Sequence, residues 1–389
     1  MNFFDDTMRR DPYRVYEQLR ASSPAFHFAP ADLYFLFDYA SVKRALHDSA
    51  VFSSAVGASR GNSFEWLMFM DPPRHTKLRA IINRAFTSRS IAALEPRIRE
   101  LAVALVDEVV ARGEVDLEEK LAAPLPMMVI AELLGLPLGD WPKLIGWSRA
   151  IMNLAATIMG PAHESAAASA DFLRADGEMQ AYLGELVTAR RAKPVDDLLT
   201  RLVTAEIDGE HLSQLELVRF FELLLAAGTE TTTNLIDNAI ICLVENPDQM
   251  ARLQSNVTLV PSAIEEVLRY RSPAQAIFRA TKQSVELHGV TIPAGKMVLP
   301  MLGAANRDPA VFPEAARFDI GRDPNPHIAF GHGIHFCLGA PLSRLEARVA
   351  LEELLPRIRT IELASTQWTP RAPFHVHGPA SLPVRIAAR

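Results

Sequence analysis

The chain has 389 residues, 49% of them hydrophobic and 22% charged, and its 40 basic and 46 acidic residues give a formal net charge of −6. This composition excludes a disordered, collagen-like or disulfide-stapled chain. The acidic balance argues against nucleic acid as a partner, because such binding depends on neutralising phosphates. No apolar run reaches the ~18 residues of a membrane span, and the start MNFFDD is too acidic for a signal peptide. We therefore expect a cytoplasmic protein without membrane insertion.

Helical patterns dominate the first 270 residues. In MDPPRHTKLR (70–79), two prolines mark a helix start, and His75 and Arg79 are four apart and share one face. Residues 213–245 form one long segment that is apolar on nearly every side. Such a helix is expected to run through the middle of a large core. Strand-like patterns occur at 33–37 and 284–298.

Only two cysteines are present, Cys242 and Cys337, which excludes a four-cysteine metal site within the chain. Cys242 lies in the apolar 213–245 segment and is interpreted as a core residue. Cys337 lies in FGHGIHFCLGAPLSRLE (330–346), among glycines and just before a helical pattern. Backbone N–H groups at a helix start favour a thiolate and predict a lowered pKa for Cys337. The glycines leave room for a flat, bulky group to approach the backbone.

This segment resembles the haem-binding loop of the cytochrome P450 superfamily, F-x-x-G-x-x-x-C-x-G, through Phe330, Gly333, Cys337 and Gly339. The resemblance implies a mainly α fold with small β-sheets, in which haem b (iron protoporphyrin IX) lies between a long distal helix and the Cys loop. It also implies one domain over 1–389, with a smaller β-rich region formed by parts of 25–60, 274–303 and 360–389. Cys337 would be the axial thiolate ligand of the haem iron, whose electron donation favours O–O cleavage. The other residues of this loop implied to contact the cofactor or tune the sulfur are Phe330, Gly331, His335, Leu338 and Gly339.

The long apolar segment contains Ala227-Gly228-Thr229-Glu230-Thr231-Thr232. A buried acid and a row of hydroxyls cost stability unless they are partnered, and Gly228 costs about 1 kcal/mol against Ala. We therefore prefer a functional interpretation of the segment to a structural one. It resembles the family's A-G-x-[DE]-T-T motif, which implies that Ala227 and Gly228 lie over the haem. Thr231 and Glu230 would be the catalytic pair that brings protons to dioxygen.

Three weaker motifs agree with this resemblance. Glu266 and Arg269 match E-x-x-R, a structural pair on the proximal side, with Arg317 in the loop that it would hold. His75 and Arg79 match H-x-x-x-R, and both would bind haem propionates together with Arg279 and His335.

The resemblance implies a monooxygenase that hydroxylates or epoxidises an apolar small molecule of fatty acid, terpenoid, steroid or polyketide type. It would use O2 and electrons from a ferredoxin, or another small redox partner, and its reductase. Family positions predict an apolar pocket with Arg60 and His375 as polar exceptions. Its lining residues would be Trp66, Phe69, Phe221, Leu224, Ala274, Ile277 and Phe374.

Two other classes of protein remain open. A haem-based sensor would not need Glu230 and Thr231 in the distal helix. A thiol hydrolase using Cys337 would need a histidine base, for which His332 and His335 are close in sequence. That class leaves the propionate-binding residues unexplained.

A final prediction concerns the electron donor. Residues 74–89 contain five Lys or Arg and no acid. On a helix, Arg74, Lys77 and Arg84 would cluster away from His75 and Arg79. We hypothesise that these three residues steer an acidic ferredoxin, with Arg344 and Arg348 as possible neighbours.

Overall fold

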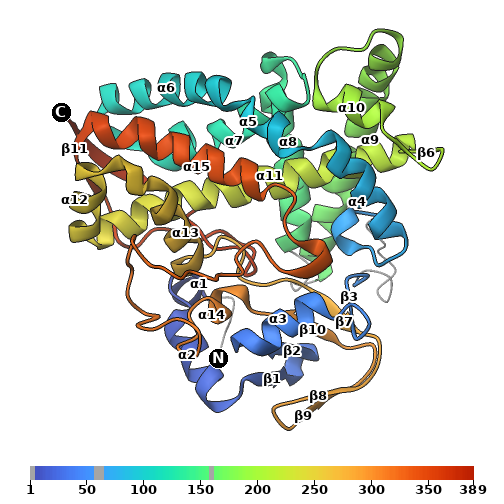
Figure 1. The fold of residues 1–389 in the computed structure, drawn as a ribbon, viewed down its shortest axis with the longest axis horizontal. Helices are drawn as coiled ribbons and strands as arrows, with labels where there is room; N and C mark the ends of the chain where they lie inside the picture. The colour runs from blue at the N-terminus through green and yellow to red at the C-terminus, as the bar shows by residue number, and fades with distance from the viewer. Residues whose placement is uncertain (1–4, 57–64, 157–161) are drawn as a thin grey trace.

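The computed structural model describes residues 5–56, 65–156 and 162–389. Long helices form one part and a twisted sheet the other (Figure 1). Within these three ranges, no helix is both long and apolar enough to cross a bilayer. The principal helices are α4 (Arg74–Ala85), α6 (Glu95–Arg112), α7 (Pro124–Leu133), α8 (Trp141–Ala156), α9 (Ala162–Ala192), α11 (Gln214–Glu245), α13 (Val260–Tyr270) and α15 (Ala340–Leu354).

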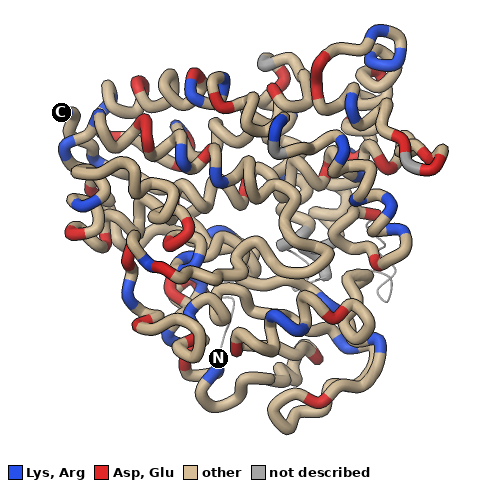
Figure 2. Tube along the Cα trace, in the orientation of Figure 1, with Lys and Arg blue, Asp and Glu red and all other residues tan. Residues whose placement is uncertain are grey.

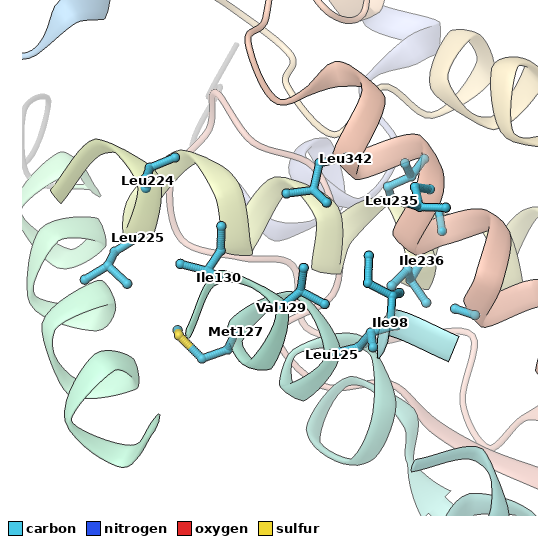
Figure 3. Packing of buried hydrophobic residues seen from close by; sticks show 14 of the residues in the cluster. Ile98, Leu125, Met127, Val129, Ile130, Leu224, Leu225, Leu235, Ile236 and Leu342 are labelled. Carbon is cyan, nitrogen blue, oxygen red and sulfur yellow. The ribbon is translucent and has the colours of Figure 1, made fainter. Parts of the chain in front are cut away.

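The central helix α11 begins at a capping box. The Ser213 hydroxyl accepts from the Glu216 N–H, and the Glu216 carboxylate accepts from the Ser213 N–H. From there α11 packs on α7, α8, α13 and α15, as its apolar pattern predicted. Figure 3 shows Val129 and Ile130 of α7 pointing toward α11. Burial of most of its length makes α11 a rigid support for the polar side chains in its middle.

The larger sheet has the strand order β1-β2-β10-β7-β3. It combines β1 (Ala25–Phe28), β2 (Leu33–Leu36) and β3 (Phe52–Ser53) with β7 (Arg279–Thr281) and β10 (Met297–Pro300). Strands β2 and β10 are parallel, with Val298 opposite Tyr34, and the other described pairs are antiparallel. Sheet pairing thus brings the N-terminal strands beside Arg279.

The C-terminal strands form a separate sheet. β11 (Ile358–Leu363) pairs with β12 (Pro383–Ala388), which pairs with β4 (Glu114–Asp116). The loop between β11 and β12 reaches the 274–303 region through the Ala274–Val376 bridge, so part of 360–389 lies beside the strands with which the sequence analysis had grouped it. Strand β12 itself pairs with β4, which directly follows α6. The single-domain organisation of the chain stays a prediction.

Candidate functional site

The Cys337 loop lies beside the middle of α11. The hydroxyls of Thr232 and Ser343 are hydrogen-bonded at 3.2 Å, which joins α11 to the first turns of α15. Cys337 N–H donates to the Phe330 carbonyl at 2.9 Å and closes the loop. Gly331 and Gly333 have φ of 75° and 77°. A Cβ at Gly333 would lie 2.9 Å from the Leu46 carbonyl oxygen, so only glycine fits this approach of the loop to α3 (Tyr39–His47).

The Cys337 thiol is held by two backbone N–H groups. Burial raises its pKa, whereas hydrogen bonds from the Gly339 and Ala340 N–H groups and the charge of Arg79 lower it. The net shift is upward, so the predicted lowering is wrong, because desolvation of the thiolate outweighs these contacts. The contributing amides are those of Gly339 and Ala340, whereas the sequence had favoured Leu338 and Gly339.

Two histidine and two arginine side chains lie close together at this loop. The rings of His75 and His335 have centroids 4.0 Å apart. Both ring nitrogens of His75 and Nε2 of His335 are buried without a hydrogen-bond partner in the described part of the chain. Arg279 is buried, and burial lowers its pKa to about 10. Arg79 donates to the Phe336 carbonyl at 2.8 Å. Unpartnered donors beside buried positive charge fit an anionic ligand such as the two carboxylates of haem.

On α11, Ala227 is exposed and Gly228 and Thr231 are half-buried, although the flanking turns are buried. Small side chains on an exposed patch of a core helix leave room for a flat cofactor to lie close to the backbone. The hydroxyls of Thr229, Thr231, Thr232 and Thr233 each donate to the carbonyl four residues earlier, which bends a helix. The Thr231 bond to the Ala227 carbonyl is 2.6 Å long.

Glu230 lies on the neighbouring face of α11. Its Oε1 is 3.7 Å from Nε of Arg371, and its Oε2 is buried without a partner among described residues. Burial raises the pKa of Glu230, while Arg371 lowers it. A carboxyl with a raised pKa is suited to hold and release a proton near neutral pH.

Glu266 and Arg269 form a fully buried pair with two bonds of 2.8 Å. Arg269 also donates to the carbonyls of Asn306, Ala315 and Arg317. Arg317 thus contributes its backbone, and its side chain makes an exposed pair with Glu314. Arg322, which sequence reasoning missed, donates to both Glu266 oxygens at 3.2 Å. Its position in an irregular loop carries no pattern that could have identified it.

The predicted pocket residues fall into three hydrophobic clusters. Trp66, Phe69, Phe221 and Leu224 belong to or pack on the largest cluster, Ala274 and Ile277 pack on a second, and Phe374 packs on a third. Trp66 stacks on Phe69 with centroids 6.0 Å apart. Arg60 lies outside the described residues. A common pocket for these side chains stays a prediction.

The basic side chains of α4 have acidic partners. Lys77 lies 2.9 Å from Glu210 on β6 (Glu210–His211), and Arg74 contacts Glu210 and Glu216. Arg84 donates to the Glu206 carbonyl at 2.6 Å. Arg344 and Arg348 pair with Glu265 and with Glu95 and Glu352, respectively. Figure 2 shows acidic residues on the β6 hairpin beside the basic residues of α4. Their charge is therefore partly compensated, and steering of a redox partner stays a prediction.

Comparisons with known proteins agree with this geometry. The family model "Cytochrome P450" matches residues 171–371. Cytochrome P450 109 of Bacillus spizizenii is 41% identical over 382 residues, which cover 96% of this chain and 92% of that protein. The chain belongs to the cytochrome P450 family. It is a P450 oxidoreductase, and the cofactor of this family is haem b, which the residues above fit.

Two solved P450 structures resemble it over nearly their whole length. CYP109Q5 from Chondromyces apiculatus has a TM-score of 0.91 and 39% identity, covering 100% of this chain and 98% of that one. CYP109E1 from Bacillus megaterium, in complex with corticosterone, has a TM-score of 0.88 and 37% identity, covering 97% and 99%. The expected fold class, mainly α with small sheets, is confirmed.

Proposed function

We propose that this P450 is a haem-thiolate monooxygenase that hydroxylates or epoxidises an apolar small molecule with electrons from a ferredoxin and its reductase. One atom of O2 enters the substrate and the other leaves as water, which consumes two electrons and two protons. The observation that carries the proposal is the acid–alcohol pair: Thr231 lies on the exposed patch of α11, and Glu230 lies on the neighbouring face with its carboxyl largely buried.

Bound haem would supply oxygen activation and electron transfer. Cys337 would hold the iron, and His75, Arg79, Arg279 and His335 would hold the propionates. Glu230 would hold a proton, and the Thr231 hydroxyl, now bonded to the Ala227 carbonyl, would turn to donate one. Ala227 and Gly228 would let the cofactor approach the helix.

The apolar character of the substrate is supported by the candidate pocket residues and by the corticosterone bound to CYP109E1. A steroid-sized apolar molecule is therefore the first class to screen. Binding would be read as the change in the haem spectrum when a ligand displaces water from the iron. The cytoplasmic location and the ferredoxin stay predictions.

The deciding experiment compares the native protein with Cys337→His. A thiolate ligand gives the reduced, carbon-monoxide-bound protein a characteristic red-shifted absorbance maximum, and an imidazole ligand does not. We expect the variant to keep haem but to lose that maximum and product formation, since imidazole donates less electron density. Unchanged spectrum and turnover in Cys337→His would rule out the proposal.

A further inference from the structure

A line of polar side chains continues along α11 beyond the acid–alcohol pair. Glu230, Asn234 and Asp237 are spaced by four and three residues, so they share one face of the helix over about 10 Å. Asn234 and Asp237 are fully buried, and the Glu230 side chain is 10% exposed. The proposed function uses only Glu230.

Four atoms of this line lack a hydrogen-bond partner among the described residues. They are Oε2 of Glu230, Nδ2 of Asn234 and both carboxyl oxygens of Asp237. Leaving a buried polar atom unpaired costs about 1–3 kcal/mol, so four in one place need an explanation. Buried water normally satisfies such groups, and each molecule needs two to four polar partners, a number that this line provides.

The line meets the surface at an ion pair. Nη2 of Arg371 lies 2.5 Å from Oε1 of Glu118, at the start of η4 (Glu118–Ala122). Nε of the same arginine donates to Oδ1 of Asn234 at 2.9 Å. The side chains of Arg371 and Glu118 are 19% and 17% exposed, so they contact both solvent and the buried line.

The surroundings favour a neutral Asp237. Burial raises its pKa well above the ordinary value, the charges of Glu118 and Asp116 raise it further, and Arg371 lowers it. A protonated Asp237 can donate a proton and accept another, as a relay requires. Fixed in the core by α11, it cannot reach solvent by moving its side chain.

We propose that Asp237, Asn234 and Glu118 hold a chain of buried water molecules that carries protons from the Glu118–Arg371 surface to Glu230. The O–H bond of Asp237 breaks as an O–H bond forms on Glu230 through water, and solvent reprotonates Asp237 by way of Glu118. One proton enters for each that leaves, and no electrons are exchanged. Asp237 acts through Glu230 and is a positioning residue. The proposal rests on the proposed function only in the destination of the proton.

The first test is infrared absorption of the resting holoenzyme and needs no turnover. A protonated carboxyl gives a C=O band, which we expect to vanish in Asp237→Asn. On transfer to D2O the Asp237 band should shift at once, because water connects it to solvent. The control is Glu346 on α15, a second fully buried carboxyl, whose raised pKa has burial as its only cause. Among the described residues, no charged side chain leads from it to the surface as Arg371 and Glu118 do from Asp237, so a single water at its one unpartnered oxygen would not connect it to solvent. The Glu346 band, identified with Glu346→Gln, should exchange much more slowly. Equally slow exchange at Asp237 would overturn the water chain.

The second test replaces the entry of the path. Glu118→Gln keeps the shape of the side chain but removes the proton site. We expect the Asp237 band to exchange roughly tenfold more slowly, the factor that corresponds to about 1.4 kcal/mol in a barrier. Exchange at the native rate would contradict entry at Glu118. If Asp237→Asn does not fold, Asp237→Glu identifies the band by its shift, because that variant keeps a carboxyl.

The third readout links the path to the reaction. In Asp237→Asn the solvent isotope effect on product formation should rise, and in Glu346→Gln it should not. Native exchange and isotope effect in Asp237→Asn and Glu118→Gln would overturn the relay while leaving the monooxygenase intact. Conversely, if the native protein itself lacks the thiolate-type absorbance maximum, the proposed function is wrong. The infrared results would still test the water chain in that case.

Discussion

The imidazole rings of His75 and His335 lie 4.0 Å apart between centroids, although they come from α4 and from the Cys337 loop. Three of their four ring nitrogens are buried without a partner in the described ranges. Burial lowers the pKa of His75, and the charge of Arg79 lowers it further. Burying these ring nitrogens without partners destabilises the folded protein when the site is empty. The pair becomes stabilising when carboxylates of a bound ligand accept its hydrogen bonds.

His75→Leu should therefore weaken haem retention more than it changes the fold. Loss of one hydrogen bond to a charged group costs about 1.5–3 kcal/mol, so we expect transfer of haem to an apo-globin acceptor to be at least about tenfold faster. His47→Leu is the control, because His47 makes a similar ring pair with His332, with centroids 5.6 Å apart, but is itself exposed on α3. Equal transfer rates in both variants would remove His75 from the cofactor site.

Thr231→Ala should uncouple electron use from product formation. Without the hydroxyl that now donates to the Ala227 carbonyl, protons are delivered less accurately and more oxygen leaves as peroxide. The quantity to measure is peroxide released per reducing equivalent, which we expect to rise severalfold. Thr233→Ala is the control, since its hydroxyl makes the same type of bond, to Thr229, in a buried turn. An unchanged peroxide ratio in Thr231→Ala would make Thr231 a structural residue.

Glu266→Gln should destabilise the protein strongly. It leaves Arg269, which is fully buried, and Arg322 without their carboxylate, and breaking a buried pair costs about 3–5 kcal/mol. Urea unfolding monitored by circular dichroism measures this loss. Glu314→Gln breaks only the exposed pair with Arg317 and should change stability by less than about 1 kcal/mol. Similar losses in the two variants would show that burial of the pair is unimportant.

Glu222 predicts a pH dependence of stability. It accepts from Nε1 of Trp66 at 2.8 Å and pairs with Arg219, which also pairs with Asp176. Burial and a hydrogen bond with Asp176 raise the pKa of Glu222 from 4.5 to about 7. The folded state then binds the proton more tightly than the unfolded state. The contribution, about 3 kcal/mol at most, is complete below pH 4.5 and is lost as the pH rises through about 7.

In Glu222→Gln this decline between pH 4.5 and about 7 should flatten, because the amide does not titrate. Asp176 does not mask the effect. Burial raises its pKa, but its hydrogen bonds with Glu222 and Arg219 lower it overall, so its contribution is lost only at more acid pH. Glu178→Gln is the matched control, since Glu178 accepts from Trp147 Nε1 at 2.8 Å on an exposed part of α9. If the stability of Glu222→Gln falls with rising pH as steeply as that of the native protein, Glu222 is not the group that titrates.

The amino-acid sequence alone was enough to predict α11, the Cys337 loop and the residues in their motifs. These features are local: the spacing of apolar residues predicts a buried helix, and glycines around Cys337 reflect backbone crowding within one loop. The Glu266–Arg269 pair was also predictable, because residues three apart on a helix face each other.

Tertiary structure decided the contacts between distant segments. The pairing of β12 with β4, the bonds from Arg322 to Glu266 and the acidic partners of Arg74 and Lys77 join residues far apart in the chain. Sequence spacing carries no information on which loop reaches which helix. The same holds for Asp237, whose residue type is visible in the sequence. That its carboxyl is buried without a hydrogen-bond partner among the described residues depends on how η4 and the loop containing Arg371 pack against α11. Desolvation and partner geometry, which set the properties of these polar groups, exist only in the folded chain.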